Sequence, residues 1–300
     1  MKSKRFMELV EKKIVVFDGA MGTMLFAAGL KAGNIPELWN IEKPEIIMSV
    51  HRQYYEAGAD VVHTNTFGGT DMKLHQKGVS DQMEAINIEA VKLARHVCPE
   101  NAFVAGDLGP TGKMLKPVGD VGMEELIETF YRQASALMKG GVDLISIETM
   151  FSLEEAVAAV RGAKLAGGCP VIAAITYNKT PNGFFTIMGE SAEQCVSAFE
   201  KEDVDVIGSN CTLGSNDMIE LVKEIRHRTK KPILFQPNAG KPVQRDGITI
   251  YEQTADEFAA DIKKIVDAGA NMVGGCCGTN ADFIKAVVKT LDQFNGSDKP

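Results

Sequence analysis

The sequence predicts an α/β fold, a (β/α)8 TIM barrel, on three observations. Eight short apolar runs alternate with amphipathic stretches, a four-residue pattern recurs before every second run, and 300 residues suit one such domain. We therefore expect a single domain over residues 1–300, with residues 1–12 as an N-terminal extension and residues 295–300 as a frayed tail.

The candidate strands are continuous apolar runs with β-branched residues, as parallel strands buried on both faces require. They cover residues 14–18, 60–65, 102–107, 143–149, 171–177, 205–210, 232–238 and 271–275. In a barrel all eight would end at one rim, which we call the C-terminal rim, and barrel enzymes keep their active sites there.

The candidate helices have the periodicity of one buried face, and several carry end signals. They cover residues 44–58, 123–141, 152–168, 191–202, 215–231, 254–269 and 280–294. The first opens with Pro44 and closes with Gly58, which are favoured at those positions. SLEE and SAEQ predict capping boxes at Ser152 and Ser191.

A weak internal repeat supports closure of the barrel. AGAD, GGVD, EDVD and AGAN end at Asp60, Asp143, Asp205 and Asn271, and they introduce the second, fourth, sixth and eighth strands. A small residue would end each helix, and the acidic or amide residue would turn the chain into the strand.

Composition and charge exclude several classes of function. The net charge is −8, and the only basic run is the short KSKR near the N-terminus, so we expect neither nucleic-acid nor anionic-membrane binding. No apolar run approaches the ~20 residues that span a bilayer, and the N-terminus lacks the apolar region of a secretory signal. We expect a cytoplasmic protein with reduced thiols, whose clustered cysteines are metal ligands or catalytic groups.

Polar and thiol side chains gather where the candidate strands end. These residues are Asp18, Thr64 to Thr66, Asp107, Glu148, Asn210, Cys211, Asn238, Cys276 and Cys277. Three long connections, 19–43, 108–121 and 239–253, also follow strands and would lie on the same rim.

Cys211, Cys276 and Cys277 would converge at the rim from the sixth and eighth strands. Three thiolates favour Zn²⁺ and leave a fourth position open, as in a catalytic zinc site. Adjacent cysteines point to opposite faces of a regular strand, so the glycines of GGCCGT would have to turn the backbone sharply. Packing cysteines or a redox-active vicinal pair are the alternatives.

Asp18 and Glu148 would share this rim and could bind a substrate ammonium group, although each could instead cap a turn or a helix. The glycine-rich GAMGT loop could meet a carboxylate with backbone N–H groups. Asp107 is expected to cap the turn that follows it, and His63 is expected to be a packing residue.

Six motifs carry a resemblance to a known family. DGAMGTML, HTNTFGG, GPTGKML, GSNC, PNAG and GGCCGT resemble the homocysteine S-methyltransferase family over about residues 15–283. The motifs are most similar to those of the N-terminal homocysteine-binding module of cobalamin-dependent methionine synthases.

The resemblance implies a zinc-dependent barrel that methylates homocysteine to methionine. Cys211, Cys276 and Cys277 would bind zinc, with Asn238 as a weak fourth ligand. Asp18 and Glu148 would hold the amino group of homocysteine, and the backbone of Gly19 and Ala20, with Thr64, would hold its carboxylate. No separate general base is assigned.

The methyl donor implied by the resemblance is methylcobalamin on a corrinoid protein or module. The alternative within the family is a small onium donor, such as S-methylmethionine or betaine, for which Trp39 and Tyr177 could form part of an aromatic cage. Outside the family, a phosphate-binding barrel lyase or aldolase would need a lysine at a strand end, and none of the candidate strands carries one. A non-catalytic zinc protein is the last alternative.

Overall fold

The computed structural model describes residues 2–245 and 248–295, and it confirms the (β/α)8 barrel. The eight parallel strands are β1 (Val15–Val16), β2 (Val61–His63), β3 (Phe103–Leu108), β4 (Leu144–Met150), β5 (Val171–Ile175), β8 (Val206–Gly214), β9 (Ile233–Asn238) and β12 (Met272–Val273). They lie in the order β1-β12-β9-β8-β5-β4-β3-β2, and a parallel bridge from Phe17 to Val61 joins the two ends. All eight predicted strands are therefore present.

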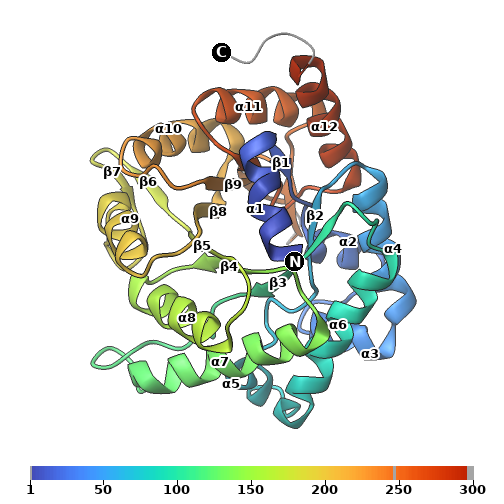
Figure 1. The fold of residues 1–300 in the computed structure, drawn as a ribbon, viewed down its shortest axis with the longest axis vertical. Coiled ribbons are helices and arrows are strands. Elements are labelled where there is room, and N and C mark those ends of the chain that lie inside the picture. Colours follow the sequence, from blue (N-terminus) through green and yellow to red (C-terminus); the bar gives the residue numbers. More distant parts are fainter. Residues whose placement is uncertain (1, 246–247, 296–300) are drawn as a thin grey trace.

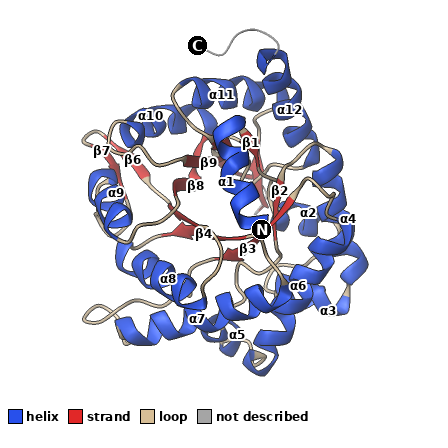
Figure 2. Cartoon of the chain, viewed as in Figure 1, coloured by secondary structure: helices blue, strands red, loops and turns tan. Residues whose placement is uncertain are grey.

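A ring of helices surrounds the strands (Figure 2). The α-helices are α1 (Lys2–Lys12), α2 (Met21–Ala27), α3 (Trp39–Glu42), α4 (Pro44–Glu56), α5 (Asp71–His75), α6 (Met83–Val97), α7 (Met123–Gly140), α8 (Leu153–Ala166), α9 (Ala192–Lys201), α10 (Ser215–Arg226), α11 (Ala255–Asp267) and α12 (Ala281–Asn295); 3-10 turns cover Pro36–Leu38 and Ser80–Gln82. All seven predicted helices form, whereas α1, α2, α3, α5 and α6 were not predicted. The predicted tail lies outside the described residues from 296 onward, and Asn295 still belongs to α12.

Helix α1 lies across the N-terminal end of the barrel (Figure 1). Its Phe6 and Val10 are buried in the same cluster as the inward-facing residues of the strands. The ring of Phe6 packs edge-on against Phe17 and Phe103, with centroids 6.5 and 5.6 Å apart. Helix α1 therefore closes the bottom of the barrel, and the way in lies at the C-terminal rim.

The last residue of each repeat links two neighbouring barrel strands by a hydrogen bond. Each side-chain oxygen accepts a hydrogen bond from a backbone N–H within a neighbouring strand. The bonds are Val16 to Asp60 (3.0 Å), Val104 to Asp143 (2.8 Å), Val171 to Asp205 (2.8 Å) and Ile233 to Asn271 (3.0 Å). The repeat thus does more than turn the chain, because it joins the second, fourth, sixth and eighth strands of the barrel each to the barrel strand that comes before it in the sequence.

One of the two predicted capping boxes forms. Ser191 accepts from the N–H of Gln194, and the Gln194 side chain accepts from the N–H of Ser191. The prediction for Ser152 is wrong, because its side chain makes no cap bond. The carboxylate of Glu155, which would complete that box, instead accepts two hydrogen bonds from Thr111 at 2.6 and 2.8 Å.

This difference predicts unequal costs for two similar substitutions. Ser191→Ala should lower the free energy of unfolding by about 1 kcal/mol, because an orphan N–H loses its acceptor. Ser152→Ala should change it by no more than about 0.5 kcal/mol. Urea denaturation followed by circular dichroism measures both, and equal losses would contradict the assignment of the caps.

Two antiparallel hairpins, which were not predicted, follow barrel strands: β6 (Asn178–Thr180) with β7 (Gly183–Phe185), and β10 (Pro242–Arg245) with β11 (Ile248–Tyr251). The second lies within the predicted 239–253 connection.

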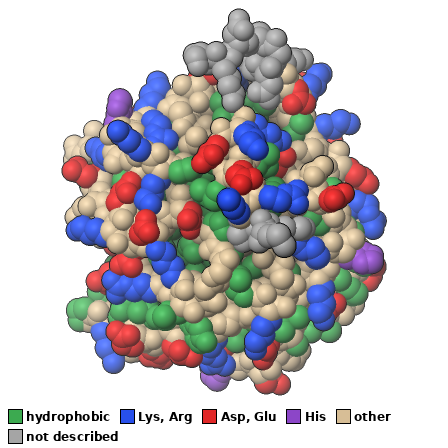
Figure 3. Space-filling view, in the orientation of Figure 1, with side chains coloured by type: hydrophobic (Ala, Val, Ile, Leu, Met, Phe, Trp, Pro, Cys, Tyr) green, Lys and Arg blue, Asp and Glu red, His purple; other side chains and the backbone are tan. Residues whose placement is uncertain are grey.

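On the face around α1, basic and acidic side chains are interspersed (Figure 3). Among the described helices, none is both long and apolar enough to cross a membrane.

Candidate functional site

The predicted cysteines meet at the C-terminal rim. The Sγ atoms of Cys211, Cys276 and Cys277, which we call the thiol cluster, all lie within 4.8 Å of one another. The Sγ atoms of Cys211 and Cys277 are 3.8 Å apart. Two thiolates on one tetrahedral Zn²⁺, with Zn–S near 2.3 Å, would be separated by about 3.8 Å. The spacing is therefore that of a metal-binding set rather than of a disulfide.

Unusual backbone geometry brings the three thiols together. Cys211 and Thr212 are left-handed, with φ of 60° and 58°, and the register of β8 against β9 shifts between Asn210 and Gly214. Gly278 is also left-handed, with φ of 84°. Left-handed residues other than glycine are costly and persist where the surrounding structure holds them, commonly at functional sites.

The thiols polarise one another. Hydrogen bonds from Cys211 and Cys276 lower the pKa of Cys277, and a further hydrogen bond from the Tyr251 phenol acts in the same direction. Hydrogen bonds with Cys211 and Cys277, together with burial, raise the pKa of Cys276. Hydrogen bonding within the thiol cluster therefore favours a thiolate at Cys277.

Tyr251 was missed in the sequence, although it lies on a connection predicted to reach the rim. Its ring rests on Gly278: a Cβ added to this glycine would lie 2.4 Å from Cγ of Tyr251. The hairpin that carries it is anchored at Gln253, whose amide nitrogen donates to Ser215 (2.7 Å) and to Asp261 (3.1 Å). Tyr251 is thus held over the thiol cluster.

Two asparagines border the thiol cluster. The amide nitrogen of Asn210 lies 2.7 Å from Thr149 Oγ1, 3.4 Å from Glu148 Oε2 and 3.9 Å from Cys276 Sγ, so it connects the carboxylate to the thiols. Asn238 is flanked by residues that hydrogen-bond the cysteine backbone, and its Oδ1 is buried without a hydrogen-bond partner among the described residues. A buried oxygen in this state is free to accept a hydrogen bond or to bind a cation.

Asp18 is engaged by a residue whose role was mispredicted. Its two carboxylate oxygens accept from the N–H of His63 (2.8 Å) and lie against His63 Nδ1 (2.7 Å). Burial lowers the pKa of His63, but the charge and hydrogen bond of Asp18, with the charges of Glu148 and Asp107, outweigh burial and raise it to about 10. His63 therefore pairs with Asp18 in addition to packing against Phe17, which is more than the predicted packing role.

Asp107 and Glu148 complete an acidic group at the top of the barrel. Burial, followed by the charge of Glu148, raises the pKa of Asp107. Burial also raises the pKa of Glu148, and the charge of His63 opposes that shift. Asp107 Oδ1 is buried and has no hydrogen-bond partner in the described part of the chain, so the expected turn cap does not form there.

Some of the groups expected to bind the substrate carboxylate already form hydrogen bonds within the protein. The N–H of Ala20 donates to Thr279 Oγ1 (3.1 Å), and Gly19 lies so close to Thr279 that an added Cβ would be 2.7 Å from the same oxygen. The Thr64 hydroxyl accepts a hydrogen bond from the N–H of Asp107 (3.1 Å) and lies 2.6 Å from Thr66 Oγ1. The Thr66 hydroxyl donates in turn to the carbonyl of Asp107. Gly19 adjoins Asp18, whereas Ala20 and Thr64 would have to exchange these partners to bind a ligand.

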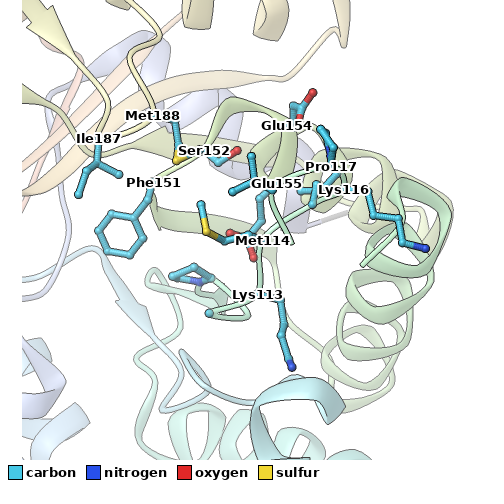
Figure 4. A pocket seen from close by; sticks show the side chains of 14 residues that line it. Lys113, Met114, Lys116, Pro117, Phe151, Ser152, Glu154, Glu155, Ile187 and Met188 are labelled. Atoms are coloured by element: carbon cyan, nitrogen blue, oxygen red, sulfur yellow. The ribbon is translucent and has the colours of Figure 1, made fainter. Parts of the chain in front are cut away.

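A separate hollow of about 370 Å³ opens among the connections after β3, β4 and β7. Met114, Phe151, Ile187 and Met188 gather around it (Figure 4), and all four are exposed. Neither the thiol cluster nor the carboxylates of Asp18 and Glu148 line this hollow. The groups able to carry out chemistry therefore belong to the barrel mouth.

The thiol cluster beside two carboxylates agrees with what the family comparison finds. Residues 15–291 match the family model "Homocysteine S-methyltransferase". The chain belongs to the homocysteine S-methyltransferase family. Among curated relatives, methionine synthase from Mycobacterium leprae is 31% identical over 98% of this chain, and that from Mycobacterium tuberculosis is 32% identical over 95%. The chain spans only 26% and 25% of the lengths of these two proteins.

Solved structures show the same fold. The homocysteine methyltransferase MmuM from Escherichia coli, in its metallated form, superposes with a TM-score of 0.77 at 23% identity, covering 94% of this chain and 98% of that one. The carboxyl transferase domain of Rhizobium etli pyruvate carboxylase gives 0.56 at 16% identity, covering 97% of this chain and 50% of that one. Both likenesses confirm the barrel, and family membership comes from the sequence.

Proposed function

We propose that this member of the homocysteine S-methyltransferase family is a zinc-dependent enzyme that methylates homocysteine to methionine. The observation that carries the proposal is the convergence of three thiols within 4.8 Å at the barrel mouth. A cytoplasmic location suits such a site, because its cysteines must stay reduced.

Zinc fits the donor atoms. The thiol cluster supplies three soft ligands, and the buried oxygen of Asn238, which lacks a partner among the described residues, supports its proposed role as a weak fourth ligand. When bound, zinc would hold the substrate sulfur as a thiolate at neutral pH. Tyr251 and Asn210 would orient the cysteines from outside, as partners of metal ligands commonly do.

The carboxylates would place the substrate. Asp18 and Glu148 would attract the ammonium group of homocysteine, while the backbone at Gly19 and Ala20, with Thr64, would face its carboxylate once the internal partners of Ala20 and Thr64 are exchanged. The substrate sulfur then attacks the methyl carbon, forming the S–CH3 bond as the bond to the donor breaks and its electron pair stays with the donor. Zinc binding would release the thiol proton to water before this step, and no separate general base is assigned.

We propose methylcobalamin, carried by a corrinoid protein or module, as the donor. Two observations weigh against a quaternary ammonium cage built on Trp39 and Tyr177. Trp39 is 4% exposed, and Lys43 Nζ lies 4.0 Å from its ring centroid; Tyr177 is 1% exposed. The resemblance to methionine synthases supports the corrinoid partner, and a donor such as S-methylmethionine or betaine is the competing candidate.

Two measurements on the purified chain test the proposal. Metal analysis should find about one zinc per chain, and homocysteine titration should fail after the metal is removed by chelation. Methylcobalamin, S-methylmethionine and betaine are then compared as donors at equal concentration. Zinc-independent homocysteine binding would overturn the proposal, whereas methionine formed only from S-methylmethionine would replace the donor and leave the rest intact.

A further inference from the structure

Asp18 and His63 hold each other in a fixed orientation through several contacts. The backbone N–H and the ring of His63 each take one oxygen of Asp18, at 2.8 and 2.7 Å. The other ring nitrogen lies 3.0 Å from Ser146 Oγ, and the ring packs against Phe17 with centroids 5.3 Å apart. Both ring nitrogens therefore have a partner, and the orientation of the imidazole is fixed.

The surrounding charge explains why a cation is needed at this place. Asp18 and Asp107 are 1% and 4% exposed, and Glu148 is half-buried at the mouth above them. Like charges repel one another in such a group, and burial raises the pKa of Asp107 and of Glu148. The charge of His63 lowers the pKa of Asp107 and of Glu148 against the effect of burial, and its ring pairs directly with Asp18 at 2.7 Å.

We propose that His63 is a positioning residue for the ammonium group of the substrate: its backbone N–H and its ring fix the orientation of the Asp18 carboxylate. This inference rests on the proposed function, since it concerns how homocysteine is held. It predicts that His63 governs the recognition of the amino group alone, and that it affects neither the thiol cluster nor the carboxylate end of the substrate.

A substrate analogue separates these contributions. 4-Mercaptobutyrate has the thiol and the carboxylate of homocysteine and lacks the amino group. The ratio of its dissociation constant to that of homocysteine measures the recognition of the ammonium group. A loss of fold stability lowers both affinities together and leaves this ratio unchanged.

The experiment compares His63→Gln with His51→Gln in the zinc-loaded chain by calorimetric titration. His51 is a matched control, because it is also buried, burial lowers its pKa to about 3, and its ring nitrogens have no partner in the described residues. His63→Gln should raise the dissociation constant of homocysteine about 10- to 100-fold, as loss of a charged hydrogen bond does. That of 4-mercaptobutyrate should change less than about twofold, and His51→Gln should leave the ratio unchanged.

Ser146→Ala provides a second variant if His63→Gln does not fold. It frees one nitrogen of the ring and should lower the ratio in the same direction by about fivefold, the effect of one neutral hydrogen bond. Equal weakening of both ligands, or an unchanged ratio in both variants, would overturn the role of His63. Failure of the wild-type chain to bind homocysteine would instead overturn the proposed function on which that role depends.

Discussion

Cys276→Ala is expected to remove zinc binding and methyl transfer together. Cys276 lies at the centre of the site, since its Sγ is within 4.8 Å of both other thiols and 3.9 Å from the Asn210 amide. Loss of a residue that only supports a metal ligand costs about 10- to 100-fold in affinity, so loss of a ligand itself should cost more than about 100-fold. Competition with a chromophoric chelator measures the affinity directly.

The control for this variant is Cys169→Ala. Cys169 is half-buried away from the rim, and its Sγ lies 3.4 Å from the sulfur of Met138. It should keep the full zinc content and the wild-type rate of methionine formation. A Cys276→Ala protein that retained both would show that the mechanism is wrong.

Asp18→Asn is expected to give the largest change in stability and to alter its dependence on pH. Removing one member of a buried ion pair costs on the order of 3–5 kcal/mol, because the other charge is left uncompensated or must be given up. The pKa of His63 is raised from 6.5 to about 10 in the folded protein. The stability that the pair contributes is therefore fully present below pH 6.5 and is lost as the pH rises through about 10.

Urea unfolding of the wild type and of Asp18→Asn between pH 6 and 10 measures this difference. The two free energies of unfolding should differ most at pH 6 and converge toward pH 10. The double variant Asp18→Asn/His63→Gln serves as the control and should show little dependence on the charge of the pair. Parallel curves for the wild type and Asp18→Asn would mean that His63 is neutral in the folded protein.

The barrel was predictable because each strand is a continuous apolar run, a signal that does not depend on distant residues. Helix α6 was missed because its polar residues include buried ones: Asn87 lies within it, is fully buried, and donates to Gly69 and Met83. Ser152 shows the opposite error. Its local pattern is correct for a cap, but the carboxylate of Glu155 accepts a hydrogen bond from Thr111, which lies 44 positions before Glu155 in the chain.

The thiol cluster was predictable from its residues and from the common rim that parallel strands create. The roles of His63 and Asp107 were not, because both depend on which side chains of neighbouring strands meet inside the barrel. Local sequence cannot distinguish a histidine packed against Phe17 from one that also pairs with Asp18. Tyr251 was missed for a similar reason, since only the folded hairpin brings it over Gly278.

Because α1 closes one end of the barrel, it affects the order in which ligands can bind and leave. With Phe6 and Val10 filling the lower end in the described residues, a substrate and its product would enter and leave through the mouth at the C-terminal rim. A bulky methyl carrier docked over that mouth would trap whatever lies beneath it. If the proposed corrinoid carrier is the donor, homocysteine would have to enter before the carrier arrives, and methionine could leave only after it departs. Steady-state kinetics should accordingly show a compulsory sequence of binding, with carrier exchange controlling the release of methionine.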